Sequence, residues 1–277
     1  MNNLVSSLHV NLLVTTARLV PLLLLALKPY PFATLTPAAA SVFDRYTASA
    51  EAETGGDVEG GTFLEIDRNP EGKAKLRSGA VSIEPATAPA EIKAPGGMIQ
   101  DWRGTIFIPH STISQVRAVL QDYDNYKQFY KPNVIESHII AHQSDDYDIF
   151  LRLYKKQVIT IVLNSEYHVR YRVIDPRRMS VISRSTRIAE VKDPDRSLTE
   201  AEQVGHDTGS LWRLNSYWRF EEADGGVYAE CRAISLSRDI PLALGWMIKG
   251  FVAKFPKESM RNTLAGTKAA VEHQSSF

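Results

Sequence analysis

The chain has 277 residues, of which 44% are hydrophobic and 23% charged, and this composition excludes a protein that is disordered along its whole length. Its 32 basic residues balance its 32 acidic residues, so we expect no general electrostatic attraction to nucleic acid. Cys231 is the single cysteine. An intramolecular disulfide is therefore excluded, which argues against a small secreted domain built on disulfides.

Residues 1–40 contain no acidic residue and include a leucine-rich run over 19–27. They end in Pro37-Ala38-Ala39-Ala40, which places small residues where a signal peptidase needs them. This pattern predicts a secretory signal peptide, and an uncleaved N-terminal membrane anchor is the alternative. We therefore expect a periplasmic or secreted protein.

Residues 41–100 predict a small N-terminal extension. A short helix is expected after Ser41, and residues 63–66 and 80–83 are expected to form a hairpin across the turn-forming Asn69-Pro70-Glu71-Gly72. Residues 86–97 are rich in proline and alanine without a hydrophobic period, which indicates a linker. The main domain then spans residues 101–277.

The main domain begins with a predicted strand over 105–109, followed by a helix whose first residues Thr112 and Gln115 have the pattern of a capping box. A second short helix is expected over 124–130. Six strands follow, over 134–142, 147–155, 158–173, 179–191, 211–221 and 227–235. The polar stretch 192–209 is long enough to be a lid, and helical sequence resumes after Pro241.

Residues 159–173 alternate apolar and polar side chains, which is the period of a strand with one buried and one solvated face. Tyr167 and Tyr171 lie on the apolar side. Glu166 and His168 lie on the other side, where we expect a solvated surface rather than an acid–base pair. The spacing of the histidines predicts no metal site.

Asp224-Gly225 predicts a two-residue type I′ turn, which fixes the register of the last two strands. One face then pairs Trp218 with Cys231 and Phe220 with Ala229, while the other face pairs Arg219 with Glu230. We interpret the first face as buried and the second as solvated. Small residues opposite two large aromatic rings leave space for a helix or a ligand.

The expected order of elements is one strand, two helices, six strands and a long helix. This order resembles the START and Bet v 1 superfamily, also known as SRPBCC, which includes polyketide cyclase and coenzyme Q-binding groups. The resemblance covers residues 102–273, and its local segments are 105–109, 123–130 and Trp218-Arg219-Phe220. It implies an α+β helix-grip fold, in which a curved antiparallel sheet wraps around a long C-terminal helix. A hydrophobic cavity is implied between them.

These observations predict an exported, noncatalytic protein that binds or carries a hydrophobic small molecule such as a lipid, an isoprenoid or a polyketide-like compound. The expected ligand contacts are Tyr167, Tyr171, Trp212, Leu214, Trp218, Phe220, Trp246, Met247 and Phe251. We predict no catalytic residue, metal or cofactor, and a transient contact with a membrane stays open. The alternatives are a cyclase or aromatase-type enzyme that uses the same cavity, and an envelope interaction module.

Overall fold

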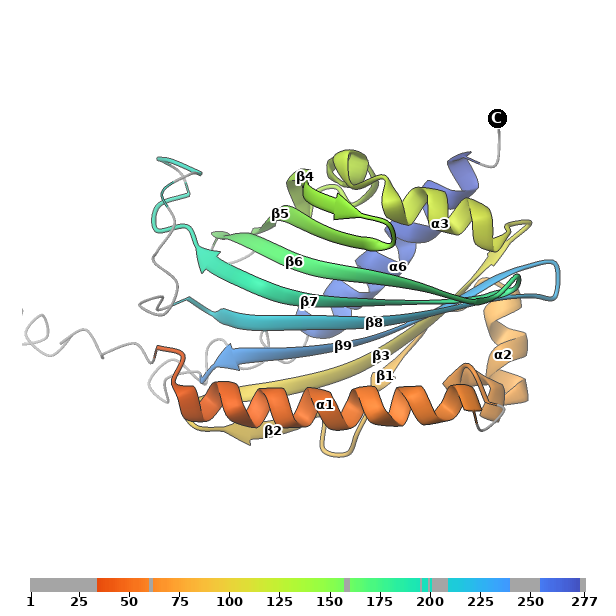
Figure 1. The fold of residues 1–277 in the computed structure, drawn as a ribbon, viewed down its shortest axis with the longest axis horizontal. Coiled ribbons are helices and arrows are strands. Elements are labelled where there is room, and N and C mark those ends of the chain that lie inside the picture. The colour runs from red at the N-terminus through yellow and green to blue at the C-terminus, as the bar shows by residue number, and fades with distance from the viewer. Residues whose placement is uncertain are drawn as a thin grey trace, which may run out of the picture. The chain divides into compact units, whose positions relative to one another are not determined.

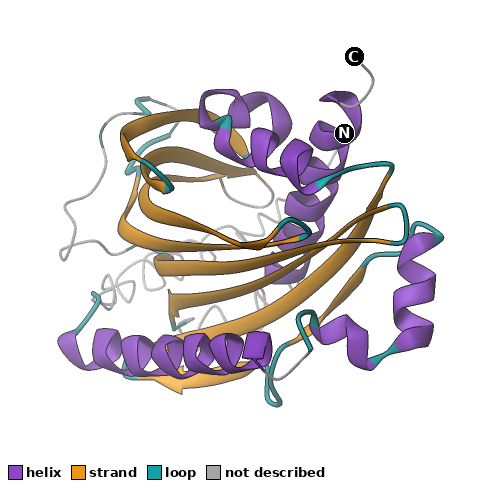
Figure 2. Ribbon diagram, turned by 45° about the vertical axis from the view of Figure 1, so that its right-hand side comes forward, coloured by secondary structure: helices purple, strands orange, loops and turns teal. Residues whose placement is uncertain are grey.

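The computed structural model describes residues 34–59, 62–156, 160–194, 196–198, 200, 209–239 and 255–274. These lie in one compact unit, Ala33–Phe277. In this part of the chain a nine-stranded antiparallel sheet curves around a C-terminal helix (Figure 1, Figure 2). None of the described helices is long and apolar enough to cross a membrane.

The helices are α1 (Pro37–Glu59), the 3-10 helix η1 (Glu65–Arg68), α2 (Pro70–Arg77), α3 (Ile113–Gln121), the 3-10 helix η2 (Tyr123–Asn125), α4 (Tyr126–Phe129) and α6 (Phe255–Gln274). The strands are β1 (Ser82–Pro85), β2 (Glu91–Ala94), β3 (Gly97–Pro109), β4 (Val134–Gln143), β5 (Asp146–Lys156), β6 (Thr160–Asp175), β7 (Arg178–Glu190), β8 (Leu211–Ala223) and β9 (Gly226–Arg238). The strands lie in the order β1-β3-β9-β8-β7-β6-β5-β4, and β2 also pairs with β3.

The predicted α+β helix-grip fold is confirmed, together with two local predictions. The side chains of Thr112 and Gln115 form the expected capping box at the start of α3. Asp224 and Gly225 have φ angles of 55° and 77°, and both values suit the type I′ turn. The β8–β9 register therefore places Trp218 opposite Cys231, as predicted.

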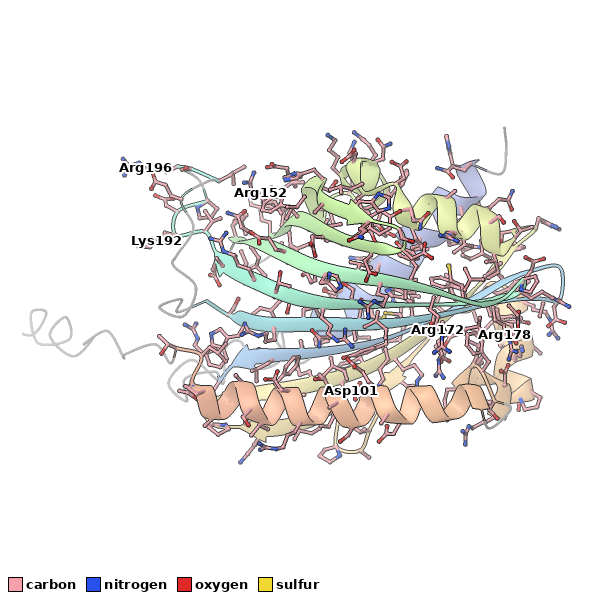
Figure 3. The ribbon with its side chains drawn as sticks, in the orientation of Figure 1. Asp101, Arg152, Arg172, Arg178, Lys192 and Arg196 are labelled. Carbon is pink, nitrogen blue, oxygen red and sulfur yellow. The ribbon has the colours of Figure 1, made fainter. Side chains whose placement is uncertain are left out.

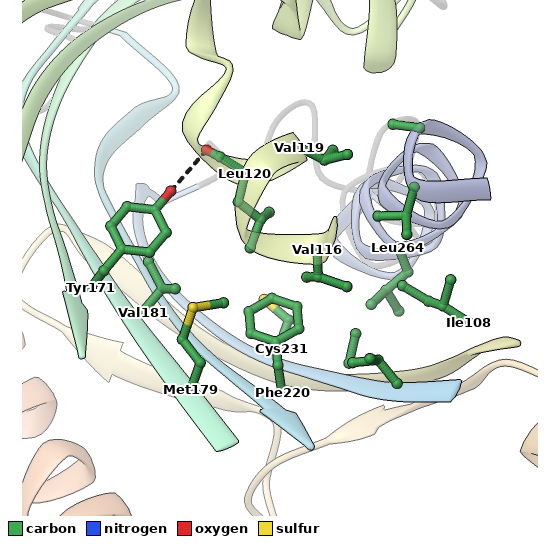
Figure 4. Close-up of a cluster of buried hydrophobic side chains, with 14 of the residues drawn as sticks. Ile108, Val116, Val119, Leu120, Tyr171, Met179, Val181, Phe220, Cys231 and Leu264 are labelled. Carbon is green, nitrogen blue, oxygen red and sulfur yellow. Dashed lines mark hydrogen bonds between the residues drawn. The ribbon is translucent and has the colours of Figure 1, made fainter. Parts of the chain in front are cut away.

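One face of the sheet, which we call the inner face, packs against α3 and α6 (Figure 4). The apolar cluster there includes Ile106, Ile108, Val116, Val119, Tyr171, Met179, Val181, Phe220, Leu264 and Val271. Gly104 of β3 lets α6 approach closely, because a Cβ atom at this position would lie 2.6 Å from Met260 Cγ and 2.7 Å from Leu264 Cδ1. The close packing of α6 on the sheet therefore requires a glycine at position 104.

The opposite, outer face of the sheet is covered where we expected it to be solvated. Arg219 is 7% exposed and Glu230 only 1%, and their side chains form an ion pair of 2.8 Å. The backbone N–H groups of Glu65 and Ile66 in η1 also donate to the Glu230 carboxylate. The expectation of an exposed Arg219–Glu230 pair is wrong, because the N-terminal residues cover this face.

The helix α1 covers the outer face through polar contacts as well as apolar ones (Figure 3). The Tyr46 hydroxyl donates to Asp101 Oδ2 at 2.8 Å, and Asp101 is itself paired with Arg232. Glu51 of α1 is paired with Arg184 of β7 at 2.6 Å. Burial raises the pKa of the Glu51 carboxyl, but hydrogen bonds from Arg184 and Tyr217 outweigh burial and leave that pKa below its ordinary value.

Two predictions for the N-terminal residues are also wrong. Residues 63–66 do not pair with 80–83: Asn69 instead caps α2, accepting a hydrogen bond from the Gly72 N–H, and Pro70 is the first helical residue. Residues 86–97 are not a linker, since β2 and the start of β3 lie there and pair with each other. The extension is therefore part of the folded unit and supplies strands of its sheet.

Candidate ligand-binding site

On the inner face, the side chains of β7, β8 and β9 become less buried from neighbouring positions on the three strands onwards. On β8, Phe220 is fully buried, whereas Trp218, Ser216 and Leu214 are half-buried. On β9, Ala229 and Cys231 are buried, whereas Ala233 and Ser235 are half-buried, and on β7 burial falls from Val181 to Ser183. Three neighbouring strands therefore leave one end of the inner face accessible.

We call this part of the inner face the open end. It comprises Trp102, Ser183, Leu214, Ser216, Trp218, Ala233 and Ser235. Its apolar members pack against the inner-face cluster, while the hydroxyls of its three serines make no hydrogen bond within the described residues. None of the open-end residues is ionisable, so the surface is apolar with a few neutral hydrogen-bonding groups, which is typical of small-molecule sites.

Two of the predicted contact residues, Trp218 and Leu214, lie at the open end. The Trp218 ring stacks on Phe220 with a centroid distance of 5.5 Å and an interplanar angle of 3°. Phe220 is 0% exposed, so it supports Trp218 from below and is a core residue. The space predicted above Phe220 is filled by the cluster under α3 and α6 (Figure 4).

Tyr167 and Tyr171 are core residues as well. The Tyr171 hydroxyl donates to the Leu120 carbonyl at 2.8 Å (Figure 4). It also shares a hydrogen bond of 2.7 Å with the Tyr123 hydroxyl. Burial raises the pKa of Tyr167 to about 12. Both phenols are thus neutral at pH 7, and that of Tyr171 already has protein partners.

Trp212 does not lie with the other predicted contacts. A β-bulge between Leu211 and Arg213 shifts the pairing of β8 with β9, and a shift of one residue moves a side chain to the opposite face. Trp212 is 2% exposed and belongs to the outer-face cluster that contains Phe43 of α1. Its predicted place on the inner face is wrong, and Trp246, Met247 and Phe251 lie outside the described residues.

Trp102 is the aromatic residue of the open end that the sequence did not indicate. The predicted strand began at residue 105, whereas β3 begins at Gly97. Ile106 and Ile108 lie on the inner face, and continuing their two-residue alternation backwards through Gly104 reaches Trp102. That alternation was the available signal, and the proline-rich sequence before it concealed the start of the strand.

The element order now identifies the architecture. Within the described residues, a long strand and two short helices precede six antiparallel strands, and α6 packs across the inner face of the sheet. The chain has a START/Bet v 1-like fold. No family model matches the sequence, and no curated protein matches it either.

Solved structures with this fold are similar to the chain at low sequence identity. A STAR-related lipid transfer protein fragment from Xanthomonas axonopodis is 16% identical, with a TM-score of 0.45 over 69% of this chain and 98% of that one. The Zhui aromatase/cyclase from a Streptomyces species is 11% identical, with a TM-score of 0.45 over 64% and 95%. A START superfamily protein from Mycobacterium smegmatis is 11% identical, with a TM-score of 0.41 over 63% and 98%.

Proposed function

We propose that this protein binds and carries a hydrophobic small molecule at the open end of its inner face, and that loading involves transient contact with a membrane. The observation that supports binding is the common loss of burial on β7, β8 and β9, which leaves Trp218, Leu214 and Ala233 accessible beside a packed core. An apolar ligand that covers these side chains removes its own apolar surface and theirs from water, which stabilises the complex by about 25 cal/mol per Å² of apolar area buried.

A noncatalytic role is the better match to the open end. A cyclase or aromatase needs a group that transfers a proton to or from its substrate, and no residue of the open end is ionisable. The open end offers serine hydroxyls and two indole rings, and the phenols of Tyr167 and Tyr171 are buried in the core. We therefore assign carriage rather than chemistry to this site.

Filling the open end at Ala233 is expected to block binding. Because Ala233 is half-buried and pairs with Ser216 and Trp102, Ala233→Phe places a ring in the space that the ligand needs. We expect uptake of a fluorescent fatty acid or isoprenoid probe to fall about ten-fold or more, which corresponds to roughly 1.4 kcal/mol of binding free energy. Fluorescence titration measures the binding.

Ala229→Phe is the matched control, because Ala229 lies four residues away on the same strand and is fully buried. Overfilling the core there is expected to cost about 1–3 kcal/mol of unfolding free energy, whereas Ala233→Phe costs less. Equal destabilisation by the two variants, with unchanged probe uptake by Ala233→Phe, would contradict the site. A native protein that takes up no apolar probe would favour the interaction module.

We also propose that the protein is exported, on the basis of the acid-free residues 1–40 and their Ala38-x-Ala40 ending. N-terminal sequencing of protein from the native host is expected to begin at or near Ser41. Cleavage there would also remove Ala39, which is 0% exposed in the outer-face cluster. A soluble cytosolic product that retains residues 1–40 would overturn the assignment.

A further inference from the structure

The indole N–H of Trp102 is a buried hydrogen-bond donor without a partner in the described part of the chain. Nearly all buried polar groups in folded proteins have a partner, and a buried N–H without one destabilises a protein by about 1–3 kcal/mol. Trp102 itself is only half-buried. The Trp102 side chain is therefore partly accessible, although its donor atom is buried.

Trp102 lies next to a contact between the sheet and α6. On β3 it pairs with Ala233 on one side and with Pro85 on the other. Gly104, the next inner-face residue of the same strand, contacts Met260 and Leu264 of α6. Trp102 thus lies one inner-face position away from a close contact between α6 and the sheet.

Two serine hydroxyls share a cross-strand row with Trp102. Ala233 pairs with Ser216, and Ser216 pairs with Ser183, so the row runs from β3 through β9 and β8 to β7. A hydroxyl can donate or accept, whereas an indole N–H only donates. The row therefore offers donors to a ligand and no positive charge.

We propose that this row recognises a neutral acceptor oxygen, such as that of a ketone or ester, on an otherwise apolar ligand, with Trp102 as the residue that determines specificity. This inference rests on the proposed function. A hydrocarbon ligand would leave the Trp102 N–H unpaired, and a site built around a hydrogen bond rejects analogues that lack the partner. A carboxylate would enter an apolar site that has no cation among its described residues, which is more costly still.

Three pyrene-labelled chains of equal length test the inference, one with a methyl ketone at its end, one with the oxygen replaced by CH₂, and one with a carboxylate. In fluorescence titrations with the full-length protein, we expect the ketone to bind about ten-fold more tightly than either of the others. Trp102→Phe keeps most of the apolar ring but removes the donor. It is expected to abolish the preference for the ketone and to leave the affinity for the hydrocarbon within about two-fold.

Trp218→Phe is the matched control, because it changes the other open-end tryptophan while leaving the Trp102 donor in place. It should weaken all three probes by a similar factor. Near-UV circular dichroism and the unfolding midpoint of each variant show whether the fold is retained. If the native protein binds no probe, the proposed function fails; if it binds all three equally, or Trp102→Phe keeps the ketone preference, only the assignment of Trp102 fails.

Discussion

Replacing Glu230 with glutamine is expected to lower the free energy of unfolding by about 3–5 kcal/mol at neutral pH, because the change removes the carboxylate of a buried ion pair. The two side chains are 2.8 Å apart and less than a tenth exposed. Glu230 also accepts hydrogen bonds from two backbone N–H groups of η1, so the change weakens the docking of the N-terminal residues too. Chemical denaturation measures the difference.

The exposed pair Glu71–Lys75 on α2 is the control, since its side chains are 82% and 66% exposed. Glu71→Gln is expected to cost less than about 0.5 kcal/mol. The double variant Arg219→Met with Glu230→Leu should be more stable than either single change, because it removes both charges of the pair together. Small and equal effects of Glu230→Gln and Glu71→Gln would show that the outer face is solvated after all.

Phe220→Ala is expected to destabilise the protein by about 3–5 kcal/mol, which is the usual effect of truncating a fully buried aromatic ring. Phe220 is 0% exposed in the inner-face cluster and stacks beneath Trp218. Leu214→Ala, on the same face of the same strand, removes a half-buried side chain and is expected to cost less than half as much. Urea denaturation with both variants gives the comparison.

The same two variants separate the core from the binding site. Leu214→Ala should change the affinity for apolar probes while the protein stays folded, because Leu214 lies at the open end. An equal or reversed order of destabilisation would mean that the packed half of the inner face lies around Leu214 instead of Phe220, and the site would have to move accordingly.

Local chemistry made much of the sheet predictable from the sequence. Asp224-Gly225 suits one kind of tight turn, and that turn determines which residues of β8 and β9 face each other as far as Arg213. The capping pattern of Thr112 and Gln115 likewise depends on residues three apart. In both cases the atoms that decide the structure are close together in the chain.

Burial of the outer face could not be predicted from the sequence, because the N-terminal residues that cover it are distant in sequence from the strands. Alternation places Arg219 and Glu230 on one face, but the same pattern describes a face in water and a face covered by another segment. The covering residues were themselves ambiguous: Asn69-Pro70 suits a turn as well as a helix start, and the structure uses it as a helix start.

The candidate site was predicted only in part for similar reasons. The two-residue period places Leu214 and Trp218 on the inner face, but it cannot show which residues of that face stay accessible. A β-bulge without a sequence signal moved Trp212 to the other face. The partner of the Tyr171 hydroxyl is a backbone carbonyl in α3, at Leu120, which no pattern within β6 reveals.

Because the N-terminal residues cover the outer face, the compact unit Ala33–Phe277 is larger than residues 102–273, which carry the START/Bet v 1-like order of elements. A fragment that begins at residue 102 would keep β4 to β9 and α6 whole, yet it would lose Asp101 and the η1 residues that bind Glu230. Side chains adapted to an interior would become surface, with Arg219 and Arg232 as the most affected. A shortened protein meant to behave like the whole should therefore retain α1, η1 and α2, even though the candidate ligand site lies on the other side of the sheet.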